Sequence, residues 1–163
     1  GDKDVMKEKP RDSKEGFFHN RIKFLILNGL LIGLTTLLAF GVGAMRYSGI
    51  YNLSALSIVA ISDSALRHSQ TMAFVVLSVS QLFFSLSLRS ETKSIFKVGV
   101  FKNKYLIASI LIGILLQFIV ITVPFLGNVF EVYPLNITDW VFVMVLSLIT
   151  LVVNEIIKIF KRK

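Results

Sequence analysis

The sequence predicts an all-α polytopic membrane protein with four transmembrane helices and both termini in the cytoplasm. Of its 163 residues, 54% are hydrophobic and only 17% are charged, whereas a soluble domain carries about 25% charged residues. No Asp, Glu, Lys or Arg occurs within the runs 24–45, 69–88, 105–130 and 140–154. A helix needs about 20 apolar residues to cross the hydrocarbon core of a bilayer. Composition and uncharged runs together argue against a soluble enzyme.

The first span is expected at 24–45, after a charged tail at 1–23 that we interpret as a cytoplasmic link. The next apolar stretch, 49–62, is only about 14 residues long, which is too short to cross a bilayer as a helix. We therefore expect a re-entrant or surface segment there. A fifth span at this place would also move the basic segment 89–104 to the outer side of the membrane.

Signals at helix ends place the second and third spans. Ser62 or Asp63 can serve as an N-cap, because either side chain can accept a hydrogen bond from the first helical turn. The second span is therefore expected at 64–88. The third is expected at 104–124, because Pro124 lacks the N–H group that would continue the helix.

The fourth span is expected at 138–160. Its uncharged run, 140–154, is too short to cross the bilayer by itself, so the helix is expected to continue beyond this run at both ends. Trp140 lies near its start, and tryptophan is enriched at the interface between membrane and water. Residues 161–163 form a short basic end beyond it. The four spans together, at 24–160, are interpreted as one membrane domain.

The net charge of +8 is distributed unevenly along the chain. Of the 18 Lys and Arg residues, 16 lie in the segments 1–23, 89–104 and 158–163. Since Lys and Arg accumulate on the cytoplasmic side of membrane proteins, these segments predict cytoplasmic termini and a cytoplasmic 89–104 loop in a multi-pass protein of the cell membrane. The basic excess thus indicates topology and contact with lipid headgroups, and no nucleic-acid partner is expected.

Residues able to perform catalysis are scarce in this chain. It has no cysteine and only two histidines, His19 and His68, which the predicted topology places on opposite sides of the membrane. The glycines lie in apolar segments and lack the Lys-Ser/Thr continuation of a phosphate-binding loop. We therefore assign no catalytic residue and no cofactor to this chain alone.

One predicted helix carries a polar face at membrane depth. This face consists of Thr71, Ser78, Gln81 and Ser85. The last three follow Thr71 by seven, ten and fourteen positions, and this spacing places all four on one side of a helix. Gln81 would lie near the midplane of the bilayer. It can form a hydrogen bond with a neighbouring helix, or supply an oxygen at a cation site, since amide oxygens suit hard cations such as calcium. Gln81 is thus the candidate metal ligand, with Ser78 and Ser85 beside it.

Two further patterns predict structural contacts. Gly29 and Gly33 are four positions apart in the first span, a spacing that lets another helix backbone approach closely. The approaching helix can belong to this four-helix unit or be absent from this chain. Near the last cytoplasmic end, Glu155 can reach Lys158 at i+3, and we interpret this pair as a structural anchor.

Short strings along the chain carry a family resemblance. They are Asp4-Val5-Met6, Thr71-Met72-Ala73-Phe74 with Gln81-Leu82-Phe83, Ser94-Ile95-Phe96, and Asn154-Glu155-Ile156-x-Lys158. Their order and spacing resemble helices seven to ten of P-type cation-transporting ATPases, in the branch that contains the calcium pumps. The resemblance implies that this chain is a C-terminal fragment comprising the last four of ten helices.

The resemblance also implies a function. This chain would be the support domain of an ATP-driven cation pump, with calcium as the expected ion. Its partners would be the upstream membrane helices, the cytoplasmic domains and lipid. ATP and Mg would act upstream, at an Asp-Lys-Thr-Gly motif outside this chain.

Within that family, Gln81 matches the one position of the support domain that contributes to the ion site. In pumps carrying two calcium ions this position is a glutamate, so the amide resembles single-calcium and sodium/potassium pumps. Gly29 and Gly33 match glycines against which the fifth helix packs. The alternative function is a self-contained four-span membrane scaffold or small channel.

Overall fold

The computed structural model describes residues 22–49, 61–88, 99 and 103–160. These residues form the helices α1 (Ile22–Ser48), α2 (Asp63–Ser87), α4 (Lys104–Thr122), α5 (Pro124–Phe130) and α6 (Ile137–Phe160). Four of them, all but α5, are long and apolar enough to cross a membrane, and no strand occurs among the described residues. The predicted all-α architecture with four spans is confirmed.

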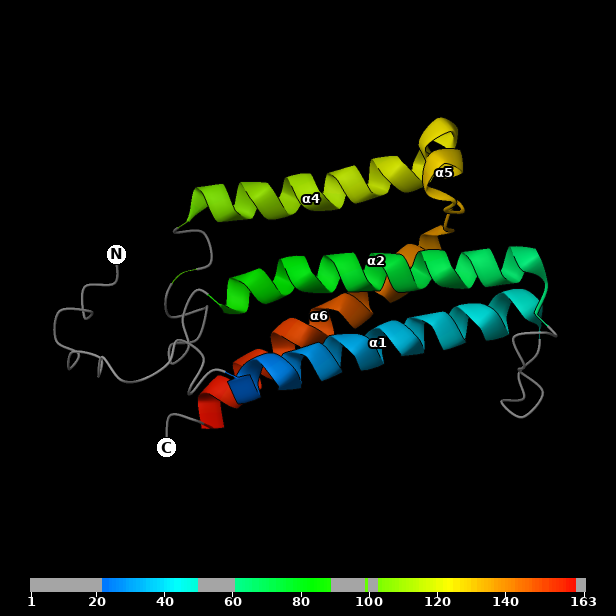
Figure 1. Cartoon of the computed structure of the whole chain (residues 1–163). Helices are drawn as coiled ribbons and strands as arrows, with labels where there is room; N and C mark the ends of the chain where they lie inside the picture. The colour runs from blue at the N-terminus through cyan, green and yellow to red at the C-terminus, as the bar shows by residue number, and fades with distance from the viewer. Residues whose placement is uncertain (1–21, 50–60, 89–98, 100–102, 161–163) are drawn as a thin grey trace, which may run out of the picture.

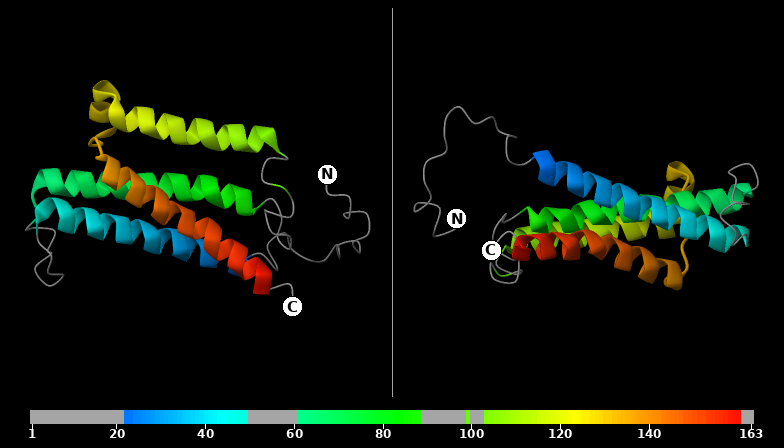
Figure 2. Two further views of the ribbon diagram at one scale, coloured as in Figure 1. Left: turned by 180° about the vertical axis from the view of Figure 1, so that it is seen from behind. Right: turned by 90° about the horizontal axis from the view of Figure 1, so that it is seen from below.

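The long helices run up and down (Figure 1). The starts of α1 and α4 and the ends of α2 and α6 lie together, and we call this the terminal end of the bundle (Figures 1 and 2). The other end, which carries α5, is the opposite end. The three basic segments of the sequence all join helices at the terminal end. This arrangement agrees with the even number of spans that the charge distribution predicts.

The helix starts follow from local side-chain chemistry. Ser62 is the N-cap of α2 and accepts a hydrogen bond from the Ala65 N–H group at 3.4 Å, which confirms one of the two predicted caps. Asn103 caps α4 in the same way, accepting from the Leu106 N–H group at 3.2 Å. Each cap satisfies one of the N–H groups that a helix leaves unpaired in its first turn.

Two helix ends differ from the expected span ends. The helix α1 continues to Ser48, three residues past the expected span end at 45, so that Arg46 lies in its last turn. The third span stops at Thr122, and Pro124 then starts the separate helix α5. Proline is favoured at a first helical position, where its missing N–H group would be unpaired anyway.

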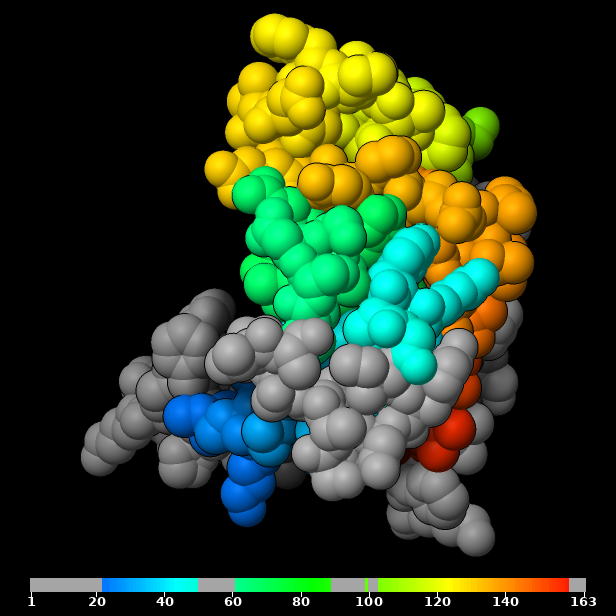
Figure 3. Space-filling model, turned by 90° about the vertical axis from the view of Figure 1, so that its right-hand side faces the viewer, coloured from blue at the N-terminus to red at the C-terminus, as the bar shows by residue number. Residues whose placement is uncertain are grey.

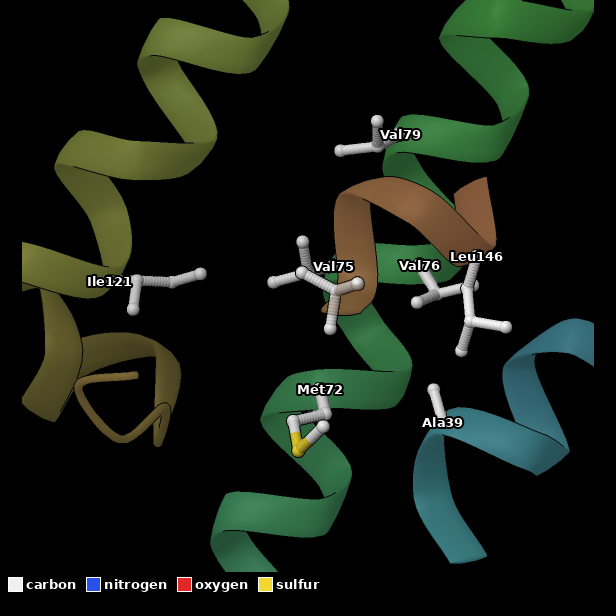
Figure 4. Packing of buried hydrophobic residues seen from close by; sticks show 8 residues of the cluster. Ala39, Met72, Val75, Val76, Val79, Ile121 and Leu146 are labelled. Carbon is white, nitrogen blue, oxygen red and sulfur yellow. The ribbon is translucent and has the colours of Figure 1, made fainter. Parts of the chain in front are cut away.

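The core is centred on α2 (Figure 4). One buried cluster joins all four long helices: Ala39 of α1, Met72, Val75, Val76 and Val79 of α2, Ile121 of α4, and Val143 and Leu146 of α6. α1 approaches α2 closely at Gly43, where an added Cβ would lie 2.9 Å from the Ser69 Cα atom. α4 lies at the edge of the bundle, and its Gly113 packs against the Leu82 side chain of α2.

Candidate ion-site face and its supporting contacts

Gln81 lies on the side of α2 that faces away from the core. It follows the buried residue Val79 by two positions, and this separation turns it about 200° round the helix axis. Its side chain is exposed, and no hydrogen bond joins it to any residue that the structure describes. The bond to a neighbouring helix, one of the two sequence interpretations, is therefore not formed within this part of the chain.

The serines beside Gln81 are half-buried. The Ser85 hydroxyl donates to the Leu82 carbonyl oxygen of its own helix at 2.6 Å. Thr71, further along the same polar face, accepts a hydrogen bond from the Tyr133 N–H group at 3.0 Å. The polar face is thus tied to the α5–α6 link at one end and is open around Gln81.

The glycine pair, Gly29 and Gly33, lies on an exposed face of α1. An added Cβ at either position would meet no described atom within 4 Å. The contrast with Gly43, which contacts the α2 backbone, shows that close helix approach occurs elsewhere on α1. No helix of the described unit packs against the glycine pair.

The glycine pair and Gln81 lie at similar depth along the bundle. Two contacts relate the antiparallel helices: Gly43 lies against Ser69, and the ring centroids of Phe24 and Phe84 are 5.8 Å apart. The glycine pair lies between these levels on α1, and Gln81 lies between them on α2. Both features therefore lie in the half of the α1–α2 pair that is nearer the terminal end.

A buried polar cluster ties the terminal end together. The Lys158 ammonium group is 2.9 Å from the Glu155 carboxylate and donates to the Ser87 carbonyl oxygen, the last of α2, at 3.0 Å. The Asn154 amide donates to Asn28 of α1 at 2.5 Å. Lys158 is 2% exposed and Asn154 is fully buried. The predicted contact between Glu155 and Lys158 is present, and sequence analysis missed its extension to α2.

A second polar cluster, which sequence analysis also missed, joins the helices at the opposite end. Asp139 of α6 is fully buried and pairs with Arg46 of α1 at 2.7 Å. Its other oxygen accepts from the Tyr47 hydroxyl, and the Tyr47 ring stacks on His68 of α2 with centroids 4.0 Å apart. Figure 3 views this end, where α1, α2 and α6 adjoin. The sequence did contain one signal for this cluster. Arg46 and Asp139 carry opposite charges, and both lie at span ends that the predicted topology places on the same side of the membrane.

Among the described residues, no group of three His, Asp or Glu side chains lies close enough together to hold a metal ion. Calcium takes six to eight oxygen ligands, so the single amide oxygen of Gln81 can only complete a site whose other ligands lie elsewhere. The open face around Gln81 leaves room for such ligands on another helix.

These observations define a class: a membrane-spanning helical unit, fastened at both ends, with an open face. The chain belongs to the family described as the C-terminus of cation-transporting ATPases, whose family model matches residues 1–160. The predicted resemblance is confirmed.

Similar proteins carry calcium-pump names. The chain is 56% identical to calcium-transporting ATPase 1 of Bacillus cereus, over 99% of this chain and 18% of that protein. It is 36% identical to the calcium-transporting ATPase of Bacillus subtilis, over 90% of this chain and 15% of that protein. It is 30% identical to calcium-transporting ATPase type 2C member 1 of Homo sapiens, over 96% of this chain and 16% of that protein. The chain thus spans less than a fifth of the length of each relative.

Proposed function

We propose that this chain is the C-terminal membrane support domain of an ATP-driven calcium pump. In this proposal, its open face packs against the upstream helices that carry most of the ion ligands. The observation that carries the proposal is the open face of the α1–α2 pair, where the glycine pair and Gln81 lie without a described partner. The similarity to calcium-transporting ATPases over nearly the whole chain supports calcium as the ion.

In such a pump, ATP and Mg act on domains outside this chain. Phosphoryl transfer to an upstream aspartate would drive alternating access, while the support domain stays nearly rigid. The polar clusters at both ends of the bundle support this role, because they fasten α1 and α2 to α6. We place the terminal end in the cytoplasm of a cell-membrane pump, because the basic segments join there.

Gln81 has a limited role in this proposal. Its amide would add one neutral oxygen to, or lie directly beside, a calcium site built by upstream carboxylates. A carboxylate at this position would add a charge that a second divalent cation could use. The neutral side chain therefore favours one calcium ion per cycle.

The test uses the full-length pump and a matched pair of glutamine variants. Gln81→Ala should lower the apparent calcium affinity for phosphorylation by about tenfold, the equivalent of ~1.4 kcal/mol. Gln81→Glu should make transport more pH-dependent, because a carboxylate at membrane depth must be neutralised by a cation or a proton.

Gln70→Ala is the control for both variants, because Gln70 is also exposed on α2 but lies three turns nearer the opposite end. It should leave calcium affinity unchanged. Unchanged affinity in both Gln81 variants, at normal expression, would contradict an ion-site role and leave a purely structural support. A protein without calcium-dependent phosphorylation would support the scaffold or small-channel alternative.

A further inference from the structure

We propose that Lys158 is a positioning residue for the ion site. Its ammonium group caps the C-terminal end of α2 and thereby fixes the depth at which α2 presents Gln81. The inference rests on the proposed function, because it assumes that Gln81 borders the calcium site.

The cap itself is a direct contact. The Lys158 ammonium group donates to the Ser87 carbonyl oxygen at 3.0 Å, and Ser87 is the last residue of α2. The last four carbonyl groups of a helix have no N–H partner within the helix, and together they carry a partial negative charge. A buried cation aimed at this end therefore holds it by both a hydrogen bond and charge attraction. Glu155, 2.9 Å from the same ammonium group, orients it.

The cap is close enough to Gln81 to control its position. Ser87 lies six positions after Gln81, a distance of about 9 Å along a helix that rises 1.5 Å per residue. A continuous hydrogen-bonded helix moves along its axis as a unit. Between its ends, α2 is held by apolar side chains of the core cluster, and hydrophobic contacts are non-directional. Thr71 also ties α2 to the α5–α6 link, ten positions before Gln81. Among the described residues, the Ser87 contact, six positions after Gln81, is the nearer of these two polar contacts and therefore has the stronger influence on the axial position of Gln81.

Positioning can be separated from stability at this site. A buried ion pair loses so much solvation that replacing both partners by well-packed hydrophobic side chains of similar volume is often neutral for stability. Removing only one partner leaves an unpaired buried charge and is strongly destabilising. The informative variant of the pump is therefore the double substitution Glu155→Leu with Lys158→Met, which removes both charges and the donor to α2 together.

The matched control lies four positions earlier on the same helix. Asn154 is as buried as Lys158, but its amide donates to Asn28 of α1 and not to α2. Asn154→Leu should lower the melting temperature of the pump without changing its calcium affinity.

The experiment measures calcium-dependent phosphorylation and melting temperature of the full-length pump for these variants and for Gln81→Ala. We expect the double variant to lose about five- to tenfold in apparent calcium affinity, where tenfold corresponds to ~1.4 kcal/mol, while its melting temperature falls no further than that of Asn154→Leu. Wild-type affinity in the double variant, an equal affinity loss in Asn154→Leu, or failure of the double variant to fold would each overturn the positioning role. Unchanged affinity in Gln81→Ala would instead overturn the proposed function on which this inference rests.

Discussion

Burying a polar side chain inside a membrane span costs free energy unless the side chain has a hydrogen-bond or ion-pair partner. Three polar residues of this chain differ in the partners they have. Asp139 is fully buried and satisfied by Arg46 and Tyr47. Asn154 is fully buried and bonds to another helix. Gln81 is exposed within α2, six positions before its last residue, and has no hydrogen-bond partner among the described residues. Of the three, Gln81 is the residue that we expect to find its partner outside this unit.

The pairing of Asp139 predicts a stability effect. Asp139→Ala should destabilise the protein by about 1–3 kcal/mol, because it removes a buried carboxylate that holds Arg46 and Tyr47 together. The control is Asp63→Ala, since Asp63 is 79% exposed in its ion pair with Arg67, and exposed pairs contribute about 0–1 kcal/mol. Melting in detergent micelles measures both variants. Equal melting temperatures would show that the buried cluster does not stabilise the bundle.

At the scale of the elements, α1 has two different glycine surfaces. Gly43 meets α2 so closely that an added Cβ would lie 2.9 Å from a backbone atom, whereas the glycine pair meets nothing within 4 Å. The sequence pattern identified glycines as sites of close helix approach but not which helix approaches. That choice depends on the rotation of α1, which is set by the core cluster and by the polar clusters at its two ends.

The two glycine surfaces predict opposite sensitivity to a large side chain. Gly43→Leu should overpack the α1–α2 contact and destabilise this chain on its own, by about 1–3 kcal/mol. Gly33→Leu should be tolerated by this chain but should impair assembly of the full-length pump. Melting temperature and membrane yield of both forms provide the measurement. An equal loss for Gly33→Leu in the two forms would place the glycine pair at a contact within the four-helix unit.

Sequence reasoning predicted the parts of the fold that depend on the bilayer and on local chemistry. Span number follows from apolar length, and the Ser62 cap follows from its position before a helical run. It did not predict α5, because Pro124 can either end one helix or begin the next. Which of the two occurs depends on the path that the chain takes to reach α6. It also missed the bond between Asn28 and Asn154, because pairing across 126 positions depends on helix rotation, which hydropathy does not specify.

At the scale of the whole molecule, the charge distribution and the helix arrangement agree on one topology. The basic segments join at the terminal end, and the α5–α6 link lies at the opposite end (Figure 1). Glu131 in that link is an exposed site for a probe, since its side chain is 76% exposed. Because the chain contains no cysteine, single cysteines can be introduced without a background of native thiols.

The topology predicts opposite labelling of two single-cysteine variants. Lys97→Cys, in the basic 89–104 segment, should react with a membrane-impermeant thiol reagent only from the cytoplasmic side. Glu131→Cys should react only from the outer side. One predicted span, 104–124, separates residue 131 from residue 97, so the two residues are expected on opposite sides of the membrane. The same reagent is applied to intact cells, which expose the outer side of the membrane, and to inside-out vesicles, which expose the cytoplasmic side. Labelling of both variants from one side would mean that 104–124 does not cross the membrane, and would contradict the four-span topology with both termini in the cytoplasm.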